Sequence, residues 1–209
     1  MEETTTTNTI ELIKKPSIKP GAKTILIIGV FHGEEPQGEY VIKKYLENGN
    51  FEDFNNHLNF IPCLNPWGKE RGVRGNHNGV DLNRNYPTKN WIETEKDEFY
   101  SGTHAASELI TRQMTELLKE LKPDIILTLH APLKCVNYDG PAKVLAEKIA
   151  EFCEYPVIAD LGYHTPGSFG TYCGVERNIP TITLEYDDKE DYESIYTKTE
   201  KIFDWLAVY

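Results

Sequence analysis

Two histidines and a glutamate stand where the chain could hold a metal ion. His32 and Glu35 lie three residues apart just after an apolar run, residues 24–30, and His130 directly follows a second one, residues 125–129. A catalytic zinc site takes three protein ligands of these types and leaves its fourth position to water, whose pKa falls to about 7. The pattern therefore predicts one Zn²⁺ ion per chain, although other divalent metals bind the same donors.

A further glutamate and an arginine would complete the chemistry of amide hydrolysis. Glu185 follows a third apolar run, residues 181–184. A carboxylate in such a place can accept the proton of the attacking water and pass it to the leaving nitrogen. An arginine can stabilise the oxyanion that forms, and Arg71 and Arg74 are the two candidates for this role.

The elements that must position these residues alternate along the chain. Apolar runs predict strands, and apolar residues at helical spacing predict helices between them. Such alternation predicts an α/β fold, a three-layer sandwich in which helices cover both faces of a mostly parallel, mixed sheet. Sites in these folds lie at the carboxyl ends of the strands. Strands are expected over residues 24–30, 58–61, 125–129, 156–159 and 181–184, and helices over residues 40–46, 109–121, 141–152 and 192–208.

The length of 209 residues suits one domain. We expect that domain to span residues 24–209, preceded by an N-terminal tail, residues 1–23, with a candidate edge strand at residues 10–13. Residues 65–89 show little periodicity and much Gly, Asn and Arg. Because long loops without regular structure are uncommon in compact domains, this segment is expected to carry function.

Composition narrows the class of partner. A formal net charge of −11 argues against a nucleic-acid binder. Lys69, Arg71, Arg74 and Arg84 nevertheless form a basic island that could attract a substrate carboxylate. No run is long enough to span a membrane, and the first residues lack the features of a signal peptide, so we expect a cytoplasmic protein with no membrane partner. Without an export signal, the four cysteines are expected to be reduced.

The order of these residues resembles the zinc carboxypeptidase family (carboxypeptidase A-like). The resemblance runs from His-x-x-Glu through Arg74-Gly75-Asn76, the specific run GVDLNRNYP at residues 79–87, and His130, to Glu185. It implies that His32, Glu35 and His130 hold zinc. It also implies that Glu185 is the general base and then the general acid.

The same resemblance assigns the remaining residues of the site. Arg74, rather than Arg71, would be the oxyanion arginine, because an asparagine follows it two residues later. Asn83 and Arg84 would hold the terminal carboxylate of the substrate, and Asp81 would orient the first zinc histidine. The family also uses a mobile tyrosine, for which Tyr163 is a loose match.

Within this family, the sequence His-Ala-Pro at residues 130–132 and the segment at residues 163–171 are most similar to the murein peptide amidases. That resemblance implies hydrolysis of the γ-D-glutamyl–diaminopimelate bond of murein tripeptide in cell-wall recycling. The partner would be a small peptide with a free carboxylate. Two alternatives stay open: a zinc deacylase of N-acyl amino acids, similar to aspartoacylase or succinylglutamate desuccinylase, and a peptide-binding module without catalysis.

Overall fold

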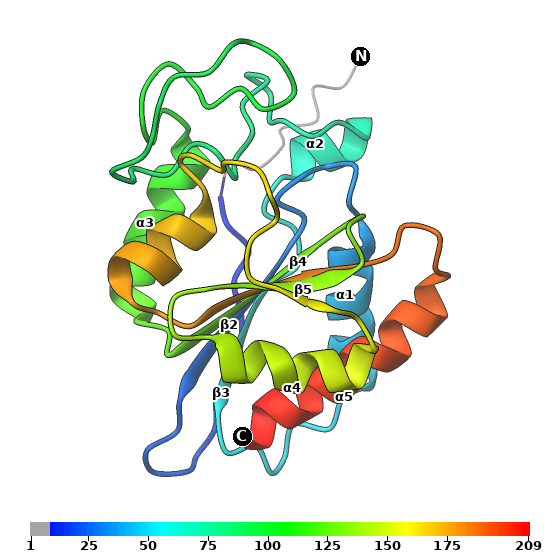
Figure 1. Cartoon of the computed structure of the whole chain (residues 1–209). Coiled ribbons are helices and arrows are strands. Elements are labelled where there is room, and N and C mark those ends of the chain that lie inside the picture. The colour runs from blue at the N-terminus through cyan, green and yellow to red at the C-terminus, as the bar shows by residue number, and fades with distance from the viewer. Residues whose placement is uncertain (1–8) are drawn as a thin grey trace, which may run out of the picture.

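A mixed sheet runs through the middle of the molecule (Figure 1), in a computed structural model that describes residues 9–209. The strands of this region lie in the order β1-β3-β2-β4-β7-β5-β6. They are β1 (Ile13–Lys15), β2 (Thr24–Gly29), β3 (His57–Ile61), β4 (Ile125–His130), β5 (Cys135–Asp139), β6 (Val157–Ile158) and β7 (Thr181–Glu185). The helices are α1 (Gln37–Asn48), α2 (Pro66–Arg71), α3 (Leu109–Leu121), α4 (Lys143–Cys153), the π-helical η1 (Thr171–Val175) and α5 (Tyr192–Val208).

Four neighbouring strands of the sheet, β3, β2, β4 and β7, are parallel, whereas β1 and β5 join antiparallel. The register sets Gly29 of β2 opposite Leu129 of β4, and His130 of β4 opposite Glu185 of β7. Because the carboxyl ends of parallel strands meet at one edge, the loops that follow β2 and β4 begin beside the end of β7. This edge holds the residues that the sequence singled out.

Helices cover both faces of the sheet, as the alternation of elements predicts. Ile25 and Ile27 of β2 pack on one side into a core that includes side chains of α1, α4 and α5. Leu26 and Ile28 point to the other side, into a second core with side chains of α3 and η1. The predicted three-layer α/β sandwich is therefore confirmed. The predicted strands and helices are all present, α3 and α5 with the predicted bounds and the others with slightly shifted ones.

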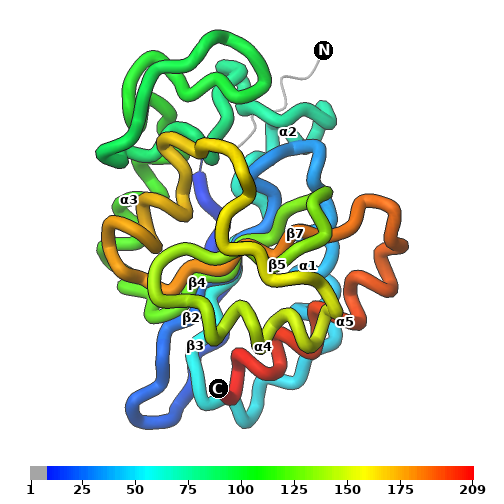
Figure 2. The backbone as a smooth tube through the Cα atoms, in the orientation of Figure 1, coloured from blue at the N-terminus to red at the C-terminus, as the bar shows by residue number. Residues whose placement is uncertain are grey.

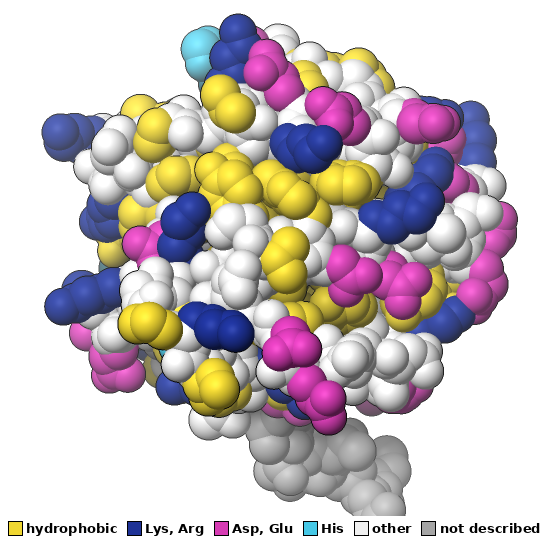
Figure 3. Space-filling model, turned by 90° about the horizontal axis from the view of Figure 1, so that it is seen from below, with side chains coloured by type: hydrophobic (Ala, Val, Ile, Leu, Met, Phe, Trp, Pro, Cys, Tyr) yellow, Lys and Arg dark blue, Asp and Glu magenta, His cyan; other side chains and the backbone are white. Residues whose placement is uncertain are grey.

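The two ends of the molecule differ in character. At the end opposite the site, α4 and α5 contact each other, and the ring of Trp205 lies tilted against the rings of Phe152 and Tyr209. Hydrophobic side chains form a band on this face (Figure 3). At the other end, the segment between α2 and α3 (green) and the one after β6 (yellow) rise above the carboxyl edge of the sheet (Figure 2). Of the helices in residues 9–209, none is both long and apolar enough to cross a membrane.

Three elements were not expected from the sequence. The segment at residues 65–89, predicted to lack regular structure, begins with α2, whose first turn is capped by the Asn65 side chain and which ends at Gly72 with φ of 61°. The second is β5, in which Asn137 and Asp139 are polar, so its sequence lacks the apolar pattern used to predict strands. The third is the π-helical η1, in a stretch where the sequence predicted no element.

The candidate edge strand also shifts, from residues 10–13 to β1, which pairs antiparallel with β3. Residues 1–8 of the expected tail lie outside the described residues, so the division of the chain at residue 24 stays a prediction.

Candidate metal centre

The loop after β2 carries the first two donors into the protein. Val30 turns the chain there with a φ of 53°, an uncommon value for a β-branched residue and one that marks local strain. The Glu35 amide then donates to the His32 carbonyl over 3.1 Å, which closes a tight turn. Asn65 ties the loop to the following segment by donating to the carbonyl of Phe31. The side chains of His32 and Glu35 are consequently both buried.

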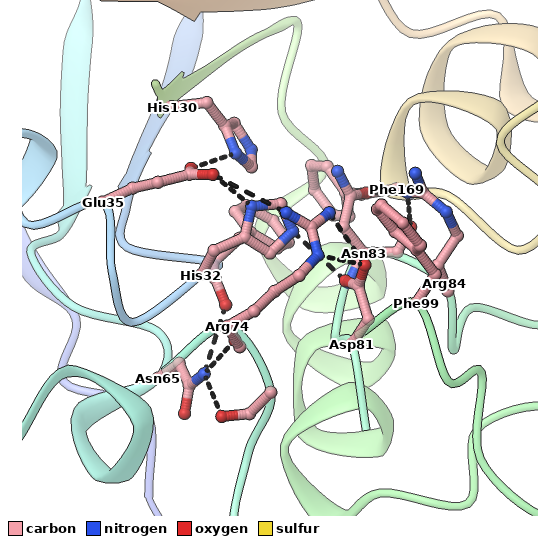
Figure 4. A network of polar contacts seen from close by, with 12 residues as sticks. His32, Glu35, Asn65, Arg74, Asp81, Asn83, Arg84, Phe99, His130 and Phe169 are labelled. Atoms are coloured by element: carbon pink, nitrogen blue, oxygen red, sulfur yellow. Dashed lines mark hydrogen bonds and ion pairs between the residues drawn. The ribbon is translucent and has the colours of Figure 1, made fainter. Parts of the chain in front are cut away.

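Three donor atoms converge at the carboxyl edge of the sheet. His32 and Glu35 come from the loop after β2, and His130 is the last residue of β4. The Glu35 carboxylate lies between the two imidazoles, with Oε1 2.7 Å from His32 Nδ1 and Oε2 2.9 Å from His130 Nδ1 (Figure 4). The ligand atoms that the three residues offer lie within 4.8 Å of one another. Two imidazoles and a carboxylate so arranged could hold a metal ion with an open position.

Asp81 supports this cluster from behind. Its Oδ1 lies 3.2 Å from His32 Nε2, on the opposite side of the ring from Glu35. Its Oδ2 accepts from Nε and Nη2 of Arg74, each over 2.9 Å. The Asn83 backbone amide donates to Oδ1 over 2.7 Å. A carboxylate on the far nitrogen of a ligating histidine fixes the ring and raises its basicity, so this arrangement fits a metal ligand.

The electrostatics of the cluster follow from burial and pairing. Burial opposes a charge on His32, but Asp81 and Glu35 outweigh it and raise the pKa of His32 to about 9. Burial likewise opposes the charge on Glu35, yet the two imidazoles lower its pKa to about 2. For Asp81, His32 and Arg74 outweigh burial and hold the pKa well below its usual range. Two ionised carboxylates thus attract a positive charge to the point where the donors meet.

Glu185 lies beside the cluster and is not bound to it. It ends β7 opposite His130, and its buried Oε2 has no hydrogen-bond partner within residues 9–209. Burial raises the pKa of Glu185 above its ordinary value, an effect that the nearby His130 only partly offsets. A buried carboxylate with a free oxygen is suited to accept a proton from a bound water.

Arg74 and Arg84 approach the site under one aromatic ring. The guanidinium carbons of Arg74 and Arg84 lie 5.0 and 5.8 Å from the centre of the Phe99 ring. Asn83 is fixed from the other side, because its Oδ1 accepts from the Phe169 amide over 2.9 Å. Figure 4 shows Arg74, Asn83, Arg84 and Phe99 in one group beside His32. Sequence patterns gave no sign of Phe99.

The basic island of the sequence does not stay together in the fold. Arg71 is exposed and pairs with Glu70, and Lys69 pairs with Glu39 of α1. Neither cation lines the cavity at the site. Of the two arginines considered for the oxyanion, only Arg74 reaches it.

A cavity of about 890 Å³ joins these groups. Its wall includes every residue predicted for metal binding, catalysis and carboxylate binding: His32, Glu35, Arg74, Asn83, Arg84, His130 and Glu185. Tyr163 and His164 of the segment after β6 also line it. So do Asn137 and Asp139 of β5, which no motif indicated.

This fold and site define a family. The chain belongs to the zinc carboxypeptidase family, because the family model described as Peptidase_M14, zinc carboxypeptidase, matches residues 4–205. It is therefore a peptide-bond hydrolase of a zinc-dependent class.

Known proteins similar to this chain include murein peptide amidase A of Escherichia coli (strain K12). The two are 32% identical over 187 residues, which cover 84% of this chain and 76% of the relative. The crystal structure of a murein-tripeptide amidase from Escherichia coli O157 superposes with a TM-score of 0.79 at 29% identity, covering 91% of this chain and 84% of the other. Carboxypeptidase A from Helicoverpa armigera shares the fold, with a TM-score of 0.72 at 13% identity over 96% of this chain and 69% of the other.

Metal binding should release a proton from His32. Its pKa of about 9 means that the imidazole is protonated at pH 7 in protein stripped of metal, and a ligating imidazole must be neutral. The apparent affinity for zinc should therefore rise about tenfold per pH unit up to pH 9. Calorimetry at pH 7 in buffers of different ionisation enthalpy should give about one proton released per zinc. Zinc binding without proton release at pH 7 would contradict this assignment.

Gly33 should be required for the shape of the loop. A Cβ atom at this position would lie 2.1 Å from the backbone carbon of Gly68 in α2, so an alanine must displace the segment between His32 and Glu35. Gly33→Ala is expected to weaken zinc binding at least about tenfold. In the control Gly21→Ala, the new Cβ meets open space at a φ of 74°. That variant should lose about 1 kcal/mol of stability and keep its zinc affinity. Equal zinc affinity in the two variants would contradict a role for Gly33 in shaping this loop.

Proposed function

We propose that this protein is a monozinc amidase that hydrolyses the γ-D-glutamyl–diaminopimelate bond of murein tripeptide. The observation that carries the proposal is the free, buried Oε2 of Glu185 beside three convergent metal donors, in one cavity with Asn83 and Arg84. Similarity to murein peptide amidase A supports the choice of substrate. A role in cytoplasmic cell-wall recycling is part of the same proposal and rests on that similarity.

His32, Glu35 and His130 would hold one zinc ion in this proposal. The donor types, their mutual distances and the Asp81 carboxylate behind His32 all suit zinc. When bound, the ion supplies a Lewis acid and lowers the pKa of water. Proton transfer, oxyanion stabilisation and substrate binding would fall to side chains of the cavity.

Glu185 would move the proton. The pKa of Glu185 is raised toward neutral pH, and a group whose pKa lies near the working pH can both accept a proton and give it back. In the proposed reaction, Glu185 accepts the proton of the attacking water and then donates it to the diaminopimelate nitrogen. The C–N bond breaks as that nitrogen leaves as an amine.

Arg74 would stabilise the oxyanion, since Asp81 and Phe99 fix its guanidinium and leave Nη1 3.8 Å from Glu35, at the edge of the donor cluster. Asn83 and Arg84 would bind the free carboxylate of the substrate. Oδ1 of Asn83 accepts from the Phe169 amide, which orients the side-chain amide, and within the described part of the chain its nitrogen has no partner and is left for the substrate. Arg84 donates from Nη1 to the Asn83 carbonyl, which ties the pair together.

Zinc-loaded wild type should release free diaminopimelate from L-Ala-γ-D-Glu-diaminopimelate, as measured by mass spectrometry. Glu185→Gln keeps the shape of the side chain and removes the base, so the rate should fall about 10²- to 10⁴-fold while zinc stays bound. Glu120→Gln, on an exposed position of α3, is the matched control and should keep full activity.

Other outcomes would point elsewhere. If zinc-loaded wild type cleaves only N-acyl amino acids, the deacylase alternative holds and the murein substrate is wrong. Tight binding of the tripeptide without cleavage would favour a peptide-binding module.

A further inference from the structure

Glu108 is a buried acid that the proposed reaction does not use. It lies directly before α3, is 5% exposed and does not line the cavity. Three neutral side chains donate to its carboxylate: Ser107 to Oε1 over 2.7 Å, and Asn76 and Asn78 to Oε2 over 2.6 and 2.8 Å. Burial opposes the charge, but these hydrogen bonds outweigh it and lower the pKa of Glu108. Any effect of Glu108 on the reaction must therefore pass through the residues that it holds.

Asn76 closes the turn between Arg74 and Asp81. Its backbone amide donates to the Val80 carbonyl over 2.9 Å, and its Oδ1 accepts from the Val80 amide over 3.1 Å. The turn brings its two ends together, so that Nε and Nη2 of Arg74 both reach Asp81 Oδ2. Because Nδ2 of Asn76 donates to Glu108, that carboxylate fixes the orientation of the amide that closes the turn.

The main chain of Glu108 holds a second segment of the site. Its backbone amide donates over 3.2 Å to Oδ1 of Asn85, a fully buried residue that directly follows Arg84. Asn85 belongs to the run at residues 79–87, and the proposed reaction gives it no role. The side chain of Glu108 thus holds the turn that carries Arg74, whereas its backbone holds the segment that carries Arg84. A substitution of the side chain alone should disturb only the first of these.

The place of Arg74 matters most in the transition state. An oxyanion develops only as the water attacks, so a donor aimed at it lowers the barrier without tightening substrate binding. A displacement of about 1 Å in such a group can cost about 10²-fold in rate. Asn83 and Arg84, which would bind the substrate carboxylate, are held separately, because Phe169 donates to Asn83 and Arg84 donates to the Asn83 carbonyl.

We propose that Glu108 is a positioning residue for the oxyanion arginine and acts on Arg74 through the amide of Asn76. This inference rests on the proposed function and adds a residue to it that contacts neither metal nor substrate. It also gives a role to the asparagine of the Arg-Gly-Asn pattern. Its consequence is measurable, because loss of the Glu108–Asn76 hydrogen bond should lower kcat and leave KM nearly unchanged.

The test reverses this hydrogen bond and follows hydrolysis of L-Ala-γ-D-Glu-diaminopimelate by the zinc-loaded protein. Asn76→Asp keeps the size of the side chain and the oxygen that accepts from Val80, but it sets a carboxylate against that of Glu108. Its kcat should fall at least about tenfold, with KM changed less than about twofold. In the double variant Asn76→Asp/Glu108→Gln, the new amide can donate to the new carboxylate. That variant should recover kcat to within about threefold of wild type.

Met114→Ala is the control for a loss of stability alone. Met114 is fully buried in the core beneath α3 and contacts neither the turn nor the cavity. This variant should be less stable because of the cavity that it creates, yet it should keep the kcat of wild type. If Asn76→Asp does not fold, Glu108→Ala and Glu108→Gln replace it. The first should lose kcat and the second should keep most of it, because its oxygen still accepts from Asn76.

The outcomes separate this inference from the proposed function. An unchanged kcat in Asn76→Asp, a change in KM alone, or no recovery in the double variant would overturn the role of Glu108 while the amidase assignment stands. If wild type releases no diaminopimelate, the amidase assignment fails, and ¹⁵N NMR of Arg74 decides about Glu108. Slow solvent exchange of its Nε proton in wild type and the double variant, but fast exchange in Asn76→Asp, would support the role. Equal exchange in all three would reject it.

Discussion

The buried carboxylate of Asp81 is the interaction on which the site depends. One of its oxygens faces His32 and the other accepts two hydrogen bonds from Arg74, so a single side chain orients both a candidate metal donor and the candidate oxyanion arginine. Breaking a buried charge pair typically costs about 3–5 kcal/mol, because the remaining charge is left uncompensated. The shared carboxylate therefore makes the metal centre and the polar side of the cavity one rigid unit.

The sheet supplies the frame for that unit. Parallel strands β2, β4 and β7 bring His32, His130 and Glu185 to one edge, although these residues are far apart in the sequence. The segments that cover the edge add Asn83 and Phe99 from one side and Phe169 from the other. The proposed metal ligands and general base thus lie at or just after strand ends, and the proposed carboxylate-binding residues lie in an irregular segment above them.

Much of the fold and of the candidate site could be predicted from the sequence, because strand ends and the run at residues 79–87 are local patterns. Metal donors follow apolar runs, and a parallel sheet must gather their ends. The contribution of β5 could not be predicted in this way. Asn137 and Asp139 line a cavity and are polar, so the sequence of β5 lacks the apolar pattern that predicts a strand. Only its register with β7 shows where it lies. Charge clustering was a poor guide as well, because Lys69 and Arg71 are occupied elsewhere.

In the proposed site, one metal ion is bound by His32, Glu35 and His130. Anomalous diffraction from crystals of the zinc-loaded protein, recorded on both sides of the zinc absorption edge, tests it most directly. A single strong peak is expected about 2.0–2.2 Å from the two Nδ1 atoms and the Glu35 carboxylate. A peak at any other place, or none in protein that contains one zinc per chain, would contradict it.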